Sequence, residues 1–371
     1  MSGRIMADDQ SRKPLVYIIG GSAEYREELV QSLVTMYRVK AFDSAAEGQF
    51  ACSVSLPVAL IVDEVVQPKG GANCIAQVRE QKITRGLPVV FTASKQNSEA
   101  IAEAQSSGGV VILIKPYWRS NLLKAMAEGV NIGVEAEWEK IEPKQRTALK
   151  NTVSSFNNIA RLIENGEPLP YGEVQESCGP LVDAIASDNY KDILRGVQNH
   201  DNYSYVHSLR VATFLGLFGN VLGIKGEDLT TLTTAGLLHD IGKMSIAPAV
   251  LNKPGKLTDD EFVVMKSHVT ATLEHLDHSI DIPKGVIIIA GQHHEKLDGT
   301  GYPNGLPGRE LNQLARMASI IDIFSAITDR RVYKDPVPPE RALDIMINMD
   351  KQLDQPLLAL FREMLLDAAT Y

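Results

Sequence analysis

Short apolar runs, separated by polar stretches with helical spacing, fill the first third of the chain. Each run is followed by turn-like residues, as buried parallel strands usually are, and we predict strands at 15–19 (LVYII), 58–62 (VALIV), 87–91 (LPVVF) and 110–114 (VVILI). Helical spacing lies between them, for example in Glu27–Tyr37 and Ile75–Gln81. This alternation of strands and helices predicts an N-terminal doubly wound α/β domain.

The strand signals fade after Pro116, and the rest of the chain has helical patterning. Residues 121–166 form a helical stretch that is broken at Pro143. Apolar positions within it follow steps of four and three, which fits either a short coiled-coil seam or an amphipathic helix packed on its own domain; these positions are Leu149, Val153, Phe156, Ala160 and Ile163. From residue 180 onward the pattern predicts helices joined by short polar loops, hence a C-terminal all-α bundle.

Composition narrows the class of protein. The chain of 371 residues has a formal net charge of −9, which argues against a protein that coats DNA or RNA through general electrostatics. Its three cysteines form no CxxC pair, and we expect a reducing, cytoplasmic compartment. The apolar runs are too short to cross a bilayer, and the polar N-terminus has no signal-peptide pattern.

All eight histidines lie at or beyond residue 200, so the candidate chemistry is concentrated in the second half. In GLLHDIGK (236–243), His239 and Asp240 end an apolar helical run. Such a pair is costly to bury unless a charge neutralises the acid, and a divalent metal would do so. The dipeptide alone is weak evidence, because a capped acid or a satisfied core histidine would look the same.

Further histidines and an aspartate also interrupt apolar helices, namely His207, His268, His293, His294 and Asp322. Helix bundles build metal sites from inward-facing side chains of this kind. Together with the HD pair they make seven candidate ligands, which suit two ions and a bridging carboxylate better than one tetrahedral ion. We interpret His200, His275 and His278 as surface residues.

Five segments carry a resemblance to a known family: HSLRVA, LLHDIGK, KSH, HHEKLDGTGYP and IIDIFSAITDRRVYK. In this order they resemble the HD-GYP family of phosphodiesterases, over roughly residues 145–371. The resemblance implies an all-helical HD domain with a two- or three-metal centre. It also implies hydrolysis of the bacterial second messenger cyclic di-GMP.

Carried over residue by residue, the resemblance implies the metal ligands His207, His239, Asp240, His268, His293, His294 and Asp322. Asp240 would bridge two divalent transition-metal ions, with Fe or Mn favoured over Ni or Zn, and no organic cofactor is implied. Lys243 would point at the phosphate and act with Asp240 in catalysis. Arg331 and Lys334 would bind phosphate oxygens, and Tyr302 would line the substrate pocket. Gly299 and Gly301 would permit a tight turn with positive φ.

One departure from the family limits the metal count. Trimetal members carry a glutamate four residues before the first histidine, where this chain has Tyr203. We therefore predict a dinuclear centre, with linear pGpG rather than GMP as the main product. Two alternatives remain: a catalytically weak protein that binds cyclic di-GMP and signals through a partner, and a hydrolase acting on another cyclic dinucleotide or on pGpG.

The N-terminal segment resembles a response-regulator receiver over about residues 14–128. Lys115–Pro116 after the run VVILI matches the receiver's lysine–proline pair, and Thr92 matches its switch threonine. The acidic pair that holds Mg²⁺ in receivers is replaced by Gly20–Gly21.

The receiver's phosphoacceptor position is also altered. Anchoring the segment on Pro68 puts Glu64 at the acceptor position, with Asp63 one residue early; in a shifted register Asp63 would be the acceptor. We expect a degenerate receiver that is not phosphorylated in the usual aspartyl fashion and that acts in regulation, dimerisation or partner docking.

These inferences define the expected organisation. We predict a disordered N-terminus at 1–13, a receiver-like domain at 14–128, a helical linker at 129–148 and the HD-GYP domain at 149–371. The expected partners are a cyclic dinucleotide substrate, signalling proteins and a second copy of the chain in a homodimer. We expect no nucleic-acid polymer and no membrane as a partner.

Overall fold

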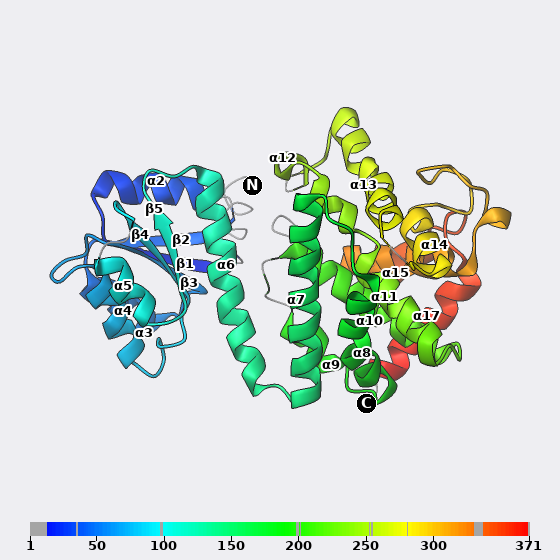
Figure 1. The fold of residues 1–371 in the computed structure, drawn as a ribbon, viewed down its shortest axis with the longest axis horizontal. Helices are drawn as coiled ribbons and strands as arrows, with labels where there is room; N and C mark the ends of the chain where they lie inside the picture. Colours follow the sequence, from blue (N-terminus) through cyan, green and yellow to red (C-terminus); the bar gives the residue numbers. More distant parts are fainter. Residues whose placement is uncertain are drawn as a thin grey trace. The chain divides into compact units, whose positions relative to one another are not determined.

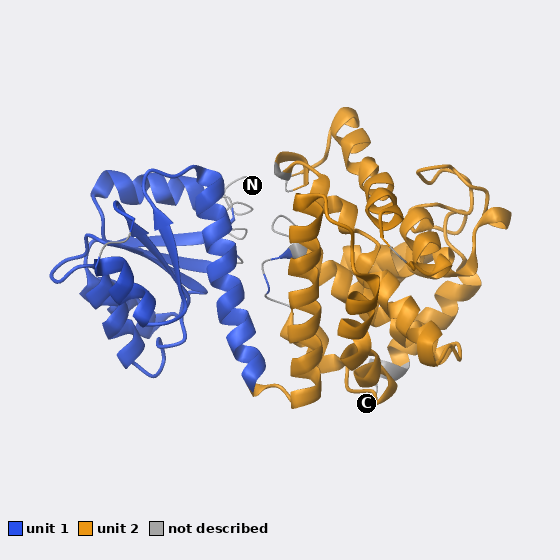
Figure 2. Cartoon of the chain, viewed as in Figure 1, with its two compact units in different colours: residues 1–139, 199–202 blue, residues 140–198, 203–371 orange. Residues whose placement is uncertain are grey.

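The structure is a computed structural model that describes residues 13–34, 36–96, 99–197, 200, 202–251, 253, 255–279, 281–329 and 337–369. The chain forms two compact units, one of residues 1–139 and 199–202 and the other of residues 140–198 and 203–371 (Figure 2). The predicted disordered segment 1–13 lies outside the described residues except for Lys13. The predicted linker 129–148 covers the end of one helix, a 3₁₀ turn and the start of the next helix.

Unit 1 is built on a five-stranded parallel sheet (Figure 1). Its strands have the order β2-β1-β3-β4-β5 and are β1 (Leu15–Ile19), β2 (Arg38–Phe42), β3 (Ala59–Asp63), β4 (Val89–Ala93) and β5 (Val110–Ile114). The doubly wound α/β fold is therefore confirmed. The inner strands β1, β3 and β4 are buried on both faces, which explains their continuous apolar runs.

Helices cover both faces of this sheet. One face packs against α2 (Ala23–Leu33) and α6 (Arg119–Glu137). The other packs against α3 (Ala45–Val54), α4 (Gly71–Glu80) and α5 (Glu99–Ser106). This arrangement leaves the carboxyl ends of β1, β3 and β4 open at one edge, where polar side chains can meet.

Unit 2 consists of helices, as predicted, and its described residues contain no strand longer than an isolated bridge. The helices are α7 (Pro143–Asn165), α8 (Tyr171–Ala186), α9 (Lys191–Gly196), α10 (Tyr203–Val221), α11 (Gly226–Leu238), α12 (Pro248–Leu251), α13 (Asp259–Asp277), α14 (Lys284–Gln292), α15 (Gln313–Thr328), α16 (Pro339–Ile347) and α17 (Gln355–Ala369). Helices α10, α11 and α15 run through the interior of the bundle (Figure 1) and are buried on nearly every side. No helix in the described part of the chain is both long and apolar enough to span a membrane.

Helix α7 decides between the two interpretations of its apolar pattern. It begins at Pro143, whose missing N–H costs nothing in the first helical turn, and it ends at Gly166 with a left-handed backbone. Its buried face continues through Ile159 and Leu162 instead of the predicted Ala160 and Ile163, and it packs on α8. The pattern therefore belongs to an amphipathic helix in the core of unit 2.

Candidate metal centre

The HD pair lies where helix α11 ends and a 3₁₀ turn begins. His239 ends α11, and Asp240 begins a 3₁₀ turn, Ile241–Ser245. The turn passes very close to α13: a Cβ added at Gly242 would lie 2.1 Å from the backbone oxygen of His268 and 2.5 Å from the nitrogen of Thr272. The Gly242 N–H donates to the Thr272 hydroxyl at 2.9 Å. Glycine is therefore required here to bring Asp240 and His268 together.

All seven predicted ligands lie close together in unit 2. They come from α10, the end of α11, α13, the residues after α14, and α15, whose helices gather in one part of the bundle (Figure 1). They form two groups, and within each group one ligand atom per residue lies within 4.8 Å of every other; the groups are His207, His239, Asp240 and Asp322, and Asp240, His268, His293 and His294. Asp240 belongs to both groups, as a bridging carboxylate would.

The hydrogen bonds of three histidines orient their free ring nitrogens into the cluster. The Nδ1 atoms of His239, His268 and His293 lie 2.7, 2.6 and 3.0 Å from backbone carbonyls of their own helices, to which they donate. In the neutral ring each Nε2 therefore carries a lone pair, and it lies 3.1–3.7 Å from an oxygen of Asp240. These buried Nε2 atoms make no hydrogen bond, nor does Oδ1 of Asp240.

Lone pairs that converge in this way fit a bound cation. Two acceptors cannot satisfy each other, and buried polar atoms without partners are costly. Imidazole and carboxylate together are a ligand set for divalent transition metals, and carbonyl hydrogen bonds to the opposite ring nitrogen are the usual outer support of such ligands. The cluster can therefore hold metal.

The ionised carboxylates of the cluster also favour a bound cation. Burial opposes ionisation of Asp240 and Asp322, but the surrounding cationic and hydrogen-bonding groups, Lys243 and His207 foremost, hold the pKa of both carboxyls well below the usual range. Burial would lower the pKa of His239, yet the charge of Asp240 raises it to about 9, so metal binding at this ring would displace a proton. Burial lowers the pKa of His207 and His293, which favours the neutral form that a metal binds.

The structure locates some of the predicted substrate-binding residues. The Lys243 ammonium, 18% exposed, donates to Oδ2 of Asp240. The Tyr302 ring packs on His294 with centroids 4.6 Å apart, and burial raises the pKa of its hydroxyl, which stays protonated. Arg331 and Lys334 lie outside the described residues, and Tyr203 is described only by its backbone at the start of α10.

Glu295 is a residue of this site that sequence reasoning did not assign. Its side chain is 1% exposed and accepts hydrogen bonds from the backbone N–H groups of Asn304 (2.7 Å) and Leu306 (3.0 Å), on the far arm of the GYP turn. The same turn folds back so closely that a Cβ at Gly301 would lie 2.4 Å from the Cα of Glu295. Glu295 thus fixes the turn that carries Tyr302.

The glycines of the turn only partly follow the sequence prediction. Gly299 has φ of +77°, as expected. Gly301 was predicted to need positive φ as well, but it is absent from the positive-φ positions of this turn, which are Gly299 and Gly305. It is needed for close backbone approach instead.

A Glu295→Gln variant is expected to weaken this turn. The amide keeps one acceptor oxygen but sets an NH₂ group against a backbone N–H, and a buried group left unsatisfied costs about 1–3 kcal/mol. We expect thermal unfolding at a lower temperature. Glu310→Gln, at a side chain 53% exposed, is the matched control and should leave the unfolding temperature unchanged. Equal unfolding temperatures for the two variants would contradict the role of Glu295.

Of the three histidines interpreted as surface residues, His200 is not one. It is 7% exposed, stacks on Trp138 with centroids 6.2 Å apart and lies 3.2 Å from a carboxylate oxygen of Glu135. Its polar sequence context hid this, because its neighbours in space come from a distant helix. His278 is exposed and His275 is half-buried.

In unit 1, the edge where β3, β4 and β5 end holds the degenerate receiver pocket. Asp63, 2% exposed, ends β3, and its Oδ2 accepts from the Thr92 hydroxyl and the Lys115 ammonium, both at 2.8 Å. Burial tends to lower the pKa of Lys115, but the hydrogen bond to Asp63 outweighs it and raises that pKa. Glu64 instead accepts from the backbone N–H of Ser94 at 2.7 Å. Asp63, rather than Glu64, is therefore the carboxylate hydrogen-bonded to both Thr92 and Lys115.

An aromatic side chain fills the space beside Asp63. A Cβ at Gly21 would lie 2.6 Å from the Tyr25 ring, and Lys115 Nζ is 4.9 Å from the centroid of that ring. The Tyr25 hydroxyl is hydrogen-bonded to that of Tyr117. Since Gly20 and Gly21 supply no carboxylate, the pocket offers Mg²⁺ few hard oxygen ligands.

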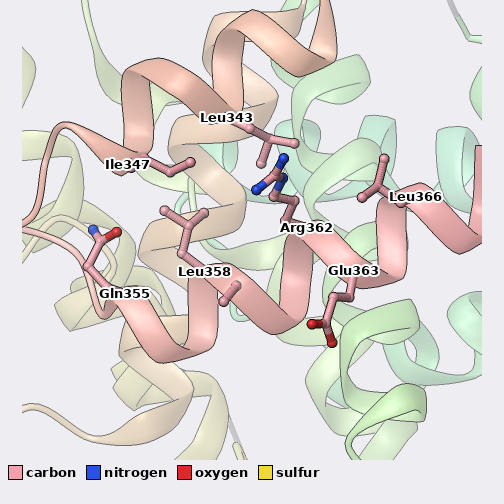
Figure 3. Close-up of a pocket in the computed structure, with 8 residues that line it drawn as sticks. Leu343, Ile347, Gln355, Leu358, Arg362, Glu363 and Leu366 are labelled. Atoms are coloured by element: carbon pink, nitrogen blue, oxygen red, sulfur yellow. The ribbon is translucent and has the colours of Figure 1, made fainter.

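A separate cleft of about 380 Å³ lies on helices α16 and α17 (Figure 3). Its walls are mainly apolar and include Leu343, Ile347, Leu358 and Leu366, with Arg362 and Glu363 at its side. It contains none of the candidate metal ligands, so the candidate chemistry does not belong to this cleft.

Comparison with known proteins agrees with this division of the chain. The HD domain family model matches residues 180–357. A probable cyclic di-GMP phosphodiesterase of Vibrio cholerae is 30% identical over 90% of this chain and 73% of its own length. The cyclic di-GMP phosphodiesterase response regulator RpfG of Xanthomonas campestris pv. campestris is 26% identical over 88% of this chain and 80% of its own length. A 3′3′-cGAMP-specific phosphodiesterase 3 of Vibrio cholerae is 41% identical, but the match spans only 39% of this chain and 31% of that relative.

An all-helical HD domain with a clustered histidine–aspartate centre, joined to a receiver-like α/β domain, defines the class of protein. The chain belongs to the HD-GYP family of cyclic dinucleotide phosphodiesterases.

Proposed function

We propose that this protein is a metal-dependent phosphodiesterase that hydrolyses cyclic di-GMP mainly to linear pGpG. The single observation that carries the proposal is the position of Asp240, which is shared by two groups of ligands and hydrogen-bonded to Lys243. The names of several relatives support the reaction class and the substrate. The relatives that are 3′3′-cGAMP-specific make a mixed cyclic dinucleotide the second candidate substrate.

The proposed centre holds two divalent ions, Fe or Mn in preference to Ni or Zn. Two groups of ligands with one common carboxylate support this number, as does the tyrosine in place of a further acid at residue 203. Bound metals supply an activated water and neutralise charge on the phosphate oxygens. His239, His268 and His293 present their Nε2 lone pairs to the ions, held in place by their Nδ1–H bonds.

The other residues of the site act on the substrate. Lys243, beside Asp240 and partly exposed, adds fixed positive charge where the phosphate gathers negative charge. Tyr302, in the turn that Glu295 holds in place, forms a wall of the site. Its protonated hydroxyl can donate a hydrogen bond to the substrate. From the family pattern we assign phosphate binding to Arg331 and Lys334 as well. Positively charged side chains at the site thus bind an anionic ligand, although the chain as a whole carries a net negative charge.

The alternative is a catalytically weak protein that binds cyclic di-GMP and signals through a partner. It is disfavoured because the two ligand groups and Lys243 are all present.

Product analysis of the metal-loaded wild type tests the proposal. We expect cyclic di-GMP to disappear with accumulation of pGpG and little GMP, measured by chromatography. Turnover of 3′3′-cGAMP but not of cyclic di-GMP would show that the mixed dinucleotide, and not cyclic di-GMP, is the substrate. Failure to cleave any cyclic dinucleotide by a protein loaded with metal would contradict the enzymatic function.

We further propose that unit 1 is a receiver-like module that is not phosphorylated and that serves regulation, dimerisation or partner docking. Asp63 is already engaged by Thr92 and Lys115, the Tyr25 ring lies next to it, and Gly20 and Gly21 supply no side-chain ligand for Mg²⁺.

Addition of Mg²⁺ and beryllofluoride, which mimics an aspartyl phosphate, is therefore expected to leave the protein unchanged. Heteronuclear NMR of the backbone amides near Asp63 should show no shift, because the pocket offers too few hard oxygen ligands to hold the Mg²⁺ that beryllofluoride binding requires. Amide shifts that require Mg²⁺ and vanish in Asp63→Asn would contradict this account.

A further inference from the structure

The outer end of the metal centre carries an exposed aromatic side chain that nothing described so far uses. Phe262, in the first half of α13, is 46% exposed. Its ring meets that of Tyr302 edge-to-face, with centroids 6.3 Å apart. Tyr302 in turn packs on His294, so a row of three rings runs from the metal ligands to the surface. With nearly half of its side chain exposed, Phe262 can still contact a ligand.

A cation lies beside the outermost ring. The Lys266 ammonium is 5.1 Å from the Phe262 ring centroid, one helical turn further along α13. The pair therefore places a positive charge over one face of the outermost ring of the row. A purine attached to a phosphate held at the metals would extend outward along this row.

Resting on the proposed function, we infer that Phe262 and Lys266 form a guanine-binding subsite at the rim of the metal centre. Bases stack on aromatic side chains, and every base has a π-face, so Phe262 serves binding in general. Lys266 supplies discrimination, because guanine presents two acceptors, O6 and N7, on the edge where adenine has a donor amino group. Phe262 is a binding residue, and Lys266 a specificity-determining one.

Steady-state kinetics of variants at residue 262 test the stacking role. Phe262→Leu keeps an apolar side chain but removes the π-face, and we expect KM for cyclic di-GMP to rise by about 5- to 100-fold with kcat and metal content little changed. Phe262→Trp should retain a low KM. Hydrolysis of methyl p-nitrophenyl phosphate, which has no base, should be unaffected in both variants.

Val263→Ala is the matched control, since this neighbouring side chain is apolar and 62% exposed. An unchanged KM in Phe262→Leu, or an equal loss with methyl p-nitrophenyl phosphate, would overturn the inference. A change in oligomeric state in both Phe262→Leu and Val263→Ala, with KM unaltered, would assign the patch to protein docking instead.

The role of Lys266 is tested by competition. Lys266→Met is expected to reduce the preference for cyclic di-GMP over 3′3′-cGAMP in kcat/KM, and an unchanged ratio would remove this residue from the subsite. A wild type that cleaves methyl p-nitrophenyl phosphate but no cyclic dinucleotide would sink the proposed function, and the subsite with it. Failure of the subsite alone would instead leave cyclic di-GMP turnover intact in the wild type.

Discussion

Replacing Asp240 by alanine is expected to abolish turnover and to strip metal from both groups of ligands. This carboxylate is the one residue common to the two groups and is hydrogen-bonded to Lys243, so its loss affects every part of the site. Removal of a single preorganised donor typically costs about 10²–10³ in rate. We expect a larger loss here, together with a metal content well below that of the wild type.

The experiment measures metal content and cyclic di-GMP turnover on the same preparations. Asp240→Asn keeps the shape of the side chain and removes its charge, and it should also lose metal. Asp228→Ala, at an exposed position in the first turn of the same helix α11, is the control and should behave as wild type. An Asp240→Ala protein that retains full metal and activity would show that the ions do not share this ligand.

A Gly242→Ala change is expected to damage the centre without touching a ligand. The added methyl group would meet backbone atoms of α13 at 2.1–2.5 Å, and backbone cannot give way as a flexible side chain can. Overpacking of this kind costs about 1–3 kcal/mol, and relief of the clash would move the 3₁₀ turn, and Asp240 with it, away from His268. We expect lower unfolding temperature, weaker metal binding and at least a tenfold loss of kcat.

Another glycine in the same unit provides the control. Gly179 lies inside α8 with nothing within 4 Å of an added Cβ, so Gly179→Ala should be neutral or stabilising by about 0.5–1 kcal/mol. Thermal unfolding and metal titration of the two variants give a direct comparison. If Gly242→Ala binds metal as tightly as Gly179→Ala, the close approach to α13 is not what builds the site.

How far the sequence predicts the fold depends on burial. Strands β1, β3 and β4 are buried on both faces, so each appears in the sequence as a continuous apolar run. Strand β2 (Arg38–Phe42) was missed because it lies at the sheet edge, where it is partly exposed and carries Arg38 and Lys40. The helical seam was misplaced at its end, where Ile159 and Leu162 are buried in place of Ala160 and Ile163.

The metal centre was more predictable than the frame around it. Histidines and acids inside apolar helices stand out, since each would be costly to bury alone. Their division into two groups through Asp240 was expected from the family pattern, and the geometry supports it. Glu295 was overlooked because its partners are backbone N–H groups, which have no signature in a sequence. Phe262 gave no signal either, since an exposed aromatic on a helix looks like one that faces the core.

In the receiver-like unit the sequence left a choice of register that only geometry could decide. Counting from Pro68 favours Glu64, while Asp63 is the carboxylate hydrogen-bonded to Thr92 and Lys115. Such contacts between segments distant in the chain cannot be counted from a sequence.

The most direct test of the account is the metal stoichiometry of protein purified anaerobically, determined together with its turnover of cyclic di-GMP. We predict about two divalent ions per chain and cleavage to pGpG. A stoichiometry near one or three ions per chain, or a protein with two ions that cleaves no cyclic dinucleotide, would contradict it.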